Sequence, residues 1–304
     1  MTDHTTAGPL LAQLARPRTE TRHRLAVIAD PHVTDGTGTW KVAHRSEARF
    51  ERALKHANSC DMAVLLGDLT GDGRADSFET VESGLSELDV PWIAVPGNHD
   101  VPKAFDGHEG RPVSAFEERY TPGLPFTWDV GRVTLVGIDT ATDETEALRE
   151  TWGGRVGPVT RRWLSDTLPG LEHPVVVMHH NLGSLPENPG GKWANFPVDD
   201  ARETREILAT NDVALVLSGH HHVPAVLDHR GPEEVVAPAV CSYPQAMLDI
   251  RIGPSGTDVR LVPLANATET AEARRHAQRG KPLAVGLLDS IDRRLGDLPL
   301  ETAR

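Results

Sequence analysis

The 304-residue sequence predicts an α/β protein in which two sheets pack face to face and helices cover their outer faces. Two observations predict this arrangement. Short runs rich in Val and Ile alternate with amphipathic stretches through the first two thirds of the chain, as strands and helices do in layered α/β folds. In the last third, strand-like runs follow one another and are separated by turn residues such as those of Gly253–Gly256.

Periodicity and flanking residues predict the individual strands and helices. Buried strands are predicted at Leu25–Ala29, Met62–Leu66, Trp92–Val95, Val133–Ile138, Val175–Met178 and Val213–Leu217. Helices are predicted at Ser46–Asn58, Ser77–Leu88, Val113–Tyr120, Val159–Thr167 and Asp199–Thr210. Later strands are predicted at Val223–Asp228, Glu234–Ala237, Met247–Ile252 and Val259–Val262, and a tight hairpin turn at Asp129–Arg132.

We expect three parts along the chain. Residues 1–23 would form an N-terminal arm with a small apolar cluster, residues 24–264 the main domain, and residues 265–304 a helical tail. The tail has helical patches at Glu269–Arg279 and Leu283–Leu295. Because the second patch carries four apolar residues at helical spacing, it indicates either a helix packed on the domain or a contact in a homodimer.

Composition argues against several classes of protein. The 44 acidic residues outnumber the 31 basic ones and give a net charge of −13, which opposes nucleic-acid binding. No apolar run approaches the ~20 residues of a membrane-spanning helix, and the first residues lack the features of a secretory signal. Two cysteines, Cys60 and Cys241, are too few for a disulfide framework and are expected to be inert. We therefore expect a cytoplasmic protein.

Five of the predicted strands end in side chains of the kinds that bind metal ions. They run into Asp30-Pro31-His32, Gly67-Asp68, Gly97-Asn98-His99-Asp100, His179-His180 and Gly219-His220-His221-His222. Ligands bind beyond the carboxyl ends of strands in open α/β sheets. One Asp after a strand is usually a cap or turn residue, but five such ends on one buried rim would leave charges unpaired. Divalent cations resolve this, and oxygen and imidazole donors suit Mn, Fe, Zn, Co or Ni.

This ordered motif set, which spans residues 30–222, resembles that of the calcineurin-like metallophosphoesterase family, in its small prokaryotic phosphodiesterase branch. The similar strand pattern continues to about residue 263. The resemblance implies a four-layer α/β-β/α sandwich of two mixed sheets, as in metallo-dependent phosphatases. It also implies a centre of two divalent metal ions, such as Mn, Fe or Zn, that hold a bridging hydroxide.

The resemblance implies a role for each residue of the motif set. The first metal ion would be bound by Asp30, His32 and His222, the second by Asn98, His179 and His220, and Asp68 would bridge both.

His99 would lie over the substrate phosphate as a general acid or as a hydrogen-bond donor to the transition state, and Asp100 would orient the His99 imidazole. Asn181 stands where the family usually has a proline. The choice of His179 over His180 as the ligand therefore depends on the family pattern alone.

Substrate choice is expected to depend on loops around this rim. Two Gly-rich loops each hold a Trp and a Lys, which could stack on a base or sugar and contact a phosphate. Alternatively, these are flexible surface loops with the Trp side chains packed inward. The candidate contacts are Trp40, Lys41, Lys192, Trp193, His180 and His221. For His221, an outward-facing position is the alternative.

The sequence thus predicts a metal-dependent hydrolase of a small phosphate ester, with a phosphodiesterase favoured. A phosphomonoesterase or a nucleotide pyrophosphatase would use the same centre. A non-catalytic scaffold is disfavoured because His99 and the full ligand set are present. A nuclease is disfavoured because the chain is acidic and has no basic stripe.

Overall fold

The computed structural model describes residues 8–36, 39–103, 110–142, 152–185 and 197–303. The strands of one sheet are β1 (Leu10–Leu14), β2 (His23–Ile28), β3 (Met62–Leu65), β4 (Trp92–Ala94), β11 (Ala246–Gly253), β12 (Gly256–Pro263) and β13 (Glu301–Thr302). Those of the other are β5 (Phe126–Val130), β6 (Val133–Gly137), β7 (Pro174–Val177), β8 (Leu215–Ser218), β9 (Ala225–Asp228) and β10 (Glu233–Val236).

The helices are α1 (Ser46–Ala57), α2 (Ala75–Leu85), α3 (Val113–Tyr120), α4 (Gly157–Thr167), α5 (Ala201–Thr210), α6 (Ala267–Gln278) and α7 (Pro282–Gly296), with short 3-10 helices η1 (Ala43–Arg45) and η2 (Leu168–Gly170). Every predicted helix and strand overlaps one of these elements, and no bound differs by more than three residues.

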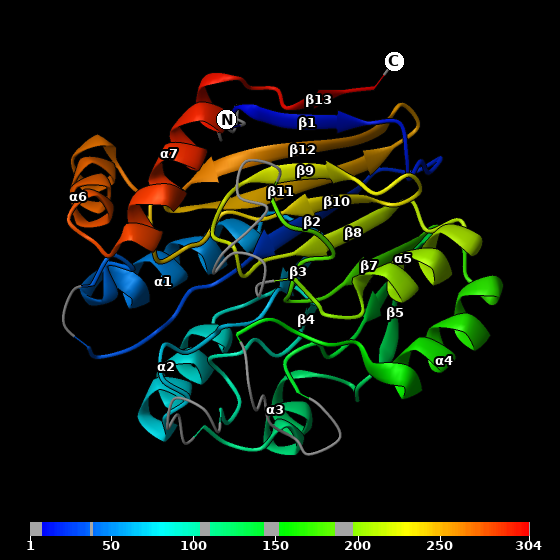
Figure 1. Ribbon diagram of the computed structural model, residues 1–304, viewed down its shortest axis with the longest axis horizontal. Helices are drawn as coiled ribbons and strands as arrows, with labels where there is room; N and C mark the ends of the chain where they lie inside the picture. Colours follow the sequence, from blue (N-terminus) through cyan, green and yellow to red (C-terminus); the bar gives the residue numbers. More distant parts are fainter. Residues whose placement is uncertain (1–7, 37–38, 104–109, 143–151, 186–196, 304) are drawn as a thin grey trace.

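The first sheet has the strand order β13-β1-β12-β11-β2-β3-β4, and the second has the order β5-β6-β7-β8-β10-β9 (Figure 1). In the first sheet β2, β3 and β4 are parallel, and in the second β6, β7 and β8 are parallel. Both sheets also contain antiparallel pairs. The expected pair of mixed sheets is therefore confirmed.

Apolar clusters hold the layers together. The central one lies between the sheets and contains side chains of both, such as Val27 of β2 and Val177 of β7. A second joins the outer face of the first sheet to α1, α2 and α3, and a third joins the outer face of the second sheet to α4 and α5. Burial of the central strands on both faces explains their nearly continuous apolar sequences.

The segment expected to be an N-terminal arm contains a strand of the sheet. β1 pairs antiparallel with β12 and parallel with β13, so both ends of the described chain lie at one sheet edge (Figure 1). Leu11 and Leu14 are fully buried in the central core. The expected division of the chain at residues 23 and 264 stays a prediction.

The apolar face of α7 is covered within the chain. Leu287 and Ile291 pack with β9 and with Trp40, which lies in the loop before α1. This favours the packed tail helix over a dimer contact for this face, because little of it is left exposed. Assembly into a homodimer stays a prediction.

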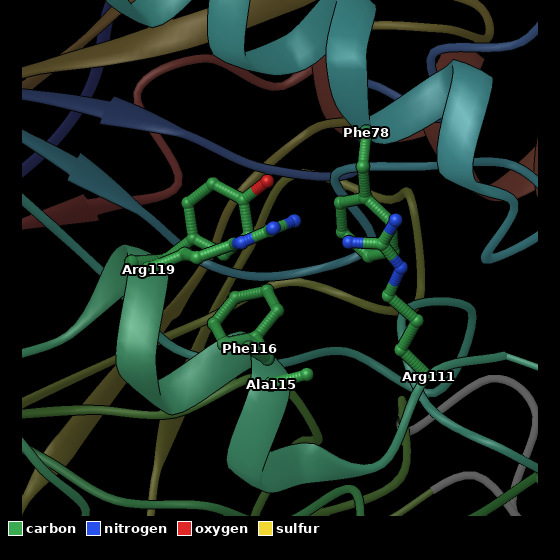
Figure 2. A pocket seen from close by; sticks show the side chains of 6 residues that line it. Phe78, Arg111, Ala115, Phe116 and Arg119 are labelled. Carbon is green, nitrogen blue, oxygen red and sulfur yellow. The ribbon is translucent and has the colours of Figure 1, made fainter.

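Helix α3 packs against α2 through an aromatic cluster. The rings of Phe78 and Tyr120 stack with centroids 5.8 Å apart, and Phe116 lies against Tyr120. The guanidinium of Arg111 lies over the Phe78 ring, as Figure 2 shows. On the other side of the cluster, Arg119 pairs with Glu82 of α2 at 3.2 Å.

The buried carboxylate of Asp249 joins β11 to β2 in the first sheet by an ion pair. Its side chain is only 2% exposed and lies 2.5 Å from Nη2 of Arg24 on β2 and 2.9 Å from Nη2 of Arg251. Burial alone would raise the pKa of Asp249, but hydrogen bonds from His56, Arg24 and Arg251 hold it well below its usual range.

We expect Asp249→Asn to lower the free energy of unfolding by about 2–3 kcal/mol at pH 7, because two arginines lose their counter-charge. The folded pKa lies below the unfolded value, so this contribution is present above pH ~4 and is lost as the pH falls through the folded pKa. Urea unfolding at pH 7 and pH 3 measures it, with the exposed Asp212→Asn as the control. An equal loss at both pH values would contradict an electrostatic origin.

Candidate metal centre

The carboxyl ends of β2, β3, β4, β7 and β8 meet at one rim between the two sheets. Backbone hydrogen bonds join the segments that leave these strands: the amide of Asp30 donates to Gly67, and the amide of Gly219 donates to His179. The structure therefore brings together the five motif segments that were expected at one rim.

The first group of side chains surrounds His32. Its Nε2 lies 3.2 Å from Oδ2 of Asp68, 3.3 Å from Nε2 of His222 and 3.8 Å from Oδ1 of Asp30. His222 Nε2 lies 3.2 Å from the same Asp30 oxygen. These are the four side chains expected around the first metal ion.

The second group surrounds His179. Its Nε2 lies 3.4 Å from Oδ1 of Asp68, 3.2 Å from Oδ1 of Asn98 and 3.2 Å from Nδ1 of His220. The two oxygens of Asp68 therefore face different groups, Oδ2 the first and Oδ1 the second. A carboxylate that bridges two cations needs this arrangement.

The donor set fits metal ions. All seven side chains are at most 8% exposed, and Oδ1 of Asp30 accepts no hydrogen bond from the described residues. The far nitrogens of two imidazoles are held from outside: His179 Nδ1 donates to the Leu66 carbonyl at 2.7 Å, and His222 Nδ1 bonds the Ser242 hydroxyl at 2.8 Å. The Nε2 lone pair of His179 therefore points inward, as in metal-ligating histidines, and Nε2 of His222 faces the Asp30 carboxylate.

Burial sets the charge of the group. It lowers the pKa of His32, His220 and His222 well below the usual range, so these imidazoles are neutral, the form that binds metals. Burial also raises the pKa of Asp30 to about 7. For Asp68, burial is outweighed by His179, Lys41 and the His99 amide, and the pKa is lowered. A divalent cation would supply the counter-charge that buried carboxylates need.

Five of the seven side chains extend from residues with left-handed backbone. The φ angles are 51° for Asp30, 45° for His32, 51° for Asp68, 64° for His220 and 60° for His222. Such conformations cost about 1–3 kcal/mol each in residues other than glycine and cluster at functional sites. The strand ends are therefore shaped for the site.

Close approach explains one glycine of the motifs. A Cβ on Gly97 would lie 2.2 Å from the Asp68 amide nitrogen and 2.3 Å from Asp68 Oδ1. Only glycine lets the loop after β4 come this near the Asp68 carboxylate.

His99 lies beside the first group with its ring partly buried. Its ring centroid is 4.6 Å from that of His32. Nδ1 donates to the Gly71 carbonyl at 2.8 Å, and Nε2 accepts from Lys41 Nζ at 3.2 Å. The backbone carbonyl fixes the tautomer and leaves Nε2 directed at the centre.

The expectation that Asp100 orients the His99 imidazole is corrected, because Gly71 takes that place. The Asp100 carboxylate instead accepts hydrogen bonds from the backbone amides of Leu69, Thr70 and Gly97 at 2.9–3.1 Å. Asp100 thus holds the loop after β3 against the loop after β4. Its influence on the site is through the positions of Asp68 and His99.

The structure brings Trp40 and Lys41 to the centre. Lys41 Nζ lies 3.1 Å from His32 Nε2 and 3.2 Å from His99 Nε2. The Trp40 ring is 5.2 Å from that of His222 and packs inward against α7. Lys192 and Trp193 lie outside the described residues.

His180 and His221 have surroundings different from those of the seven candidate ligands. His180 Nε2 donates to the Trp152 carbonyl at 3.0 Å and Nδ1 accepts from the Thr140 hydroxyl at 3.0 Å, so both nitrogens are occupied. The outward-facing position considered for His221 is wrong: the residue is 2% exposed, and burial lowers its pKa to about 4.

Asn181 has its own structural role where a proline was expected. Its side-chain amide donates to Ser218 Oγ at 2.8 Å and to the Gly219 carbonyl at 3.1 Å. It therefore joins the segment after β7 to the segment after β8, which carry His179 and His220.

We expect His179→Ala to lower the metal content of the protein, because its Nε2 lies at the middle of the second group. His180→Ala should keep the metal and instead lower stability by about 1–3 kcal/mol, because it leaves buried polar partners unsatisfied. Metal analysis after loading with Mn²⁺ and removal of excess ion measures both. The opposite pattern would show that His180 is the ligand.

Sequence reasoning missed several partners of the centre. Gly71 and Leu66 act through backbone carbonyls, which leave no trace in residue type. Ser242 fixes His222 but follows no motif. Cys241 is buried with a free thiol, as expected, yet its sulfur lies within 4.8 Å of the donor nitrogens of His32 and His222.

Two mixed sheets with Asp, Asn and His side chains gathered at their strand ends are typical of a metallo-dependent phosphatase-like fold. Solved structures show the same fold. A dimetal phosphatase from Danio rerio superimposes with a TM-score of 0.65 at 13% identity, over 80% of this chain and 97% of that one. Purple acid phosphatase PPD1 from yellow lupin gives 0.58 at 14%, over 82% and 52%.

The chain belongs to the calcineurin-like phosphoesterase family, whose model matches residues 23–224. A probable cyclic nucleotide phosphodiesterase of Psychrobacter sp. is 25% identical over 64% of this chain. The chain spans little more than half of that relative, 56% of its length. The 3',5'-cyclic adenosine monophosphate phosphodiesterase CpdA of Escherichia coli K12 is 23% identical over 73% of this chain and 78% of its own length.

Among the described residues, every helix is too short or too polar to cross a membrane.

Proposed function

We propose that this protein is a binuclear metal-dependent phosphodiesterase whose substrate is a cyclic nucleotide. The observation that carries the proposal is the position of Asp68, whose two oxygens face two separate sets of ligands. The similarity to known and probable cyclic nucleotide phosphodiesterases supports the substrate class.

The residues of the chain supply binding, charge and a proton. Asp30, His32 and His222 would hold one divalent ion and Asn98, His179 and His220 the other, with Asp68 shared. Bound ions would clamp phosphoryl oxygens and supply a hydroxide for in-line attack.

His99 would act as the proton or hydrogen-bond donor to the substrate when its Nε2 carries a proton. With Nδ1 held by Gly71, its Nε2 is the atom that exchanges a proton or donates a hydrogen bond at the phosphate. This suits either protonation of the leaving oxygen or stabilisation of developing charge.

Lys41 would provide positive charge for the phosphate in a chain of net charge −13. We expect Lys41→Met to raise KM about tenfold and to leave metal content unchanged, because it removes one charge-assisted hydrogen bond. Steady-state kinetics and metal analysis measure the two effects. Lys55→Met, at an exposed position of α1, is the control. An unchanged KM would remove Lys41 from the substrate site.

The proposed function is tested by comparing bis-p-nitrophenyl phosphate with p-nitrophenyl phosphate. Protein freed of metal by a chelator is assayed with and without added Mn²⁺, Fe²⁺ or Zn²⁺. Preference for the diester, lost on chelation, supports a phosphodiesterase, and cyclic AMP and cyclic GMP are then compared. Preference for the monoester would contradict the proposal and indicate a phosphatase. No hydrolysis of any of these compounds by metal-loaded protein would also contradict it.

A further inference from the structure

A second set of metal-binding side chains lies away from the rim, where α6 meets η1. His44 of η1 and Glu272 and His276 of α6 each offer one donor atom, and the three atoms lie within 4.8 Å of one another. The three side chains are partly or largely exposed. The proposed function uses none of them.

The local geometry suits a shared ion. His44 Nε2 lies 3.0 Å from Glu272 Oε1, and the rings of His44 and His276 have centroids 5.7 Å apart. Glu272 and His276 are four residues apart on a helix, so they project from the same face. Two of the three ligands are therefore placed by the backbone of α6, and the third comes from a segment 228 residues away in sequence.

Charge around the set is compatible with a cation. Arg45 binds Glu272 through Oε2 at 3.1 Å, which leaves Oε1 as the oxygen that faces His44. The hydrogen bond from His44 lowers the pKa of Glu272, as does Arg45, so the carboxylate is ionised. A metal ion would take the position of the proton that His44 now shares with Glu272.

We propose that His44, Glu272 and His276 form a surface site for one borderline divalent cation such as Zn²⁺. Two imidazoles and one carboxylate match the ligands that Zn²⁺ takes in open sites, where water completes the coordination. Mg²⁺ and Ca²⁺ prefer oxygen donors and would bind poorly.

An ion at this site would stiffen one side of the candidate metal centre. η1 begins two residues after Lys41, and Trp40, next to it, packs against α7 and lies beside His222. An ion that joins η1 to α6 would therefore restrain the end of the loop that places Lys41 beside His99.

The test separates this site from the centre by using the centre-disabled variant. Two proteins are equilibrated with micromolar Zn²⁺, and their bound zinc is counted. One is Asp68→Ala, and the other is a triple variant that adds His44→Gln and His276→Gln to Asp68→Ala. We expect the triple variant to bind one equivalent fewer. His23→Gln and His173→Asn in the same Asp68→Ala background serve as the matched control and should keep that equivalent.

A second measurement needs no variant. In the full-length wild-type protein, Zn²⁺ should protect His44 and His276 from carbethoxylation, as mapped by mass spectrometry, and Mg²⁺ should not. Equal zinc content in the two variants, or modification of both histidines unaffected by Zn²⁺, would overturn the proposal. Neither readout depends on hydrolysis, so the proposed function can fail while this site stands.

Discussion

Asp68→Ala is expected to abolish both metal binding at the centre and hydrolysis, with turnover reduced at least about 10³-fold. One side chain serves both ligand groups: Oδ2 faces His32 at 3.2 Å and Oδ1 faces His179 at 3.4 Å. Oδ1 also accepts the His99 amide at 2.7 Å. Truncation therefore removes a ligand from each group and loosens the loop that carries His99.

The measurement is metal content by elemental analysis together with hydrolysis of a phosphodiester, on protein that is shown to be folded by circular dichroism. Asp68→Asn keeps the shape of the side chain and removes its charge, so it should also bind metal weakly. Asp166→Ala, on the exposed face of α4, is the control for loss of a carboxylate elsewhere. A folded Asp68→Ala protein with full metal content would refute the bridging role.

The residues of the candidate centre were predictable because they follow the ends of strands. A strand end can be located from the sequence close to it. Asp30 comes directly after an apolar run typical of a buried strand, and Asp68 follows another such run after one glycine. Parallel strands bring their carboxyl ends to one edge. Once the strands are correct, the convergence of the ligands follows from the sheet.

Contacts made over long separations were less predictable. Leu10–Leu14 looks like part of a polar arm because its partner strand β12 lies about 245 residues further along the chain; Gln13, for instance, bonds Asp258. The segment becomes a strand because the edge strand β12 is there to pair with it, and its own sequence does not show this. The role expected of Asp100 was wrong for a related reason, since the acceptor for His99 is a backbone carbonyl.

The three neighbouring histidines after β8 also show that side-chain direction was not predictable from the sequence. Alternation along an extended chain would send His221 outward, but the backbone is left-handed at both His220 and His222. With such a backbone, alternation does not apply, and His221 is buried beside the ligands. Residue types indicated the candidate site, whereas the direction of each side chain required the structure.

His99→Ala is expected to keep the metal content of the wild type and to reduce turnover by about 10²–10⁴-fold. The imidazole lies beside the ligand groups, its Nδ1 is held by the Gly71 carbonyl, and its Nε2 faces Lys41. Its loss removes a donor without removing a ligand. His173→Asn, at an exposed position whose φ of 43° asparagine tolerates, is the control.

The size of the loss on two substrates distinguishes the two roles of His99. A p-nitrophenolate leaves without help from an acid, whereas the alkoxide released from a cyclic nucleotide needs a proton. If His99 is the general acid, the variant should lose far more activity on cyclic AMP than on bis-p-nitrophenyl phosphate. Equal losses would mean that His99 stabilises charge on the phosphoryl oxygens, and full activity on both substrates would show that the imidazole has no part in the reaction.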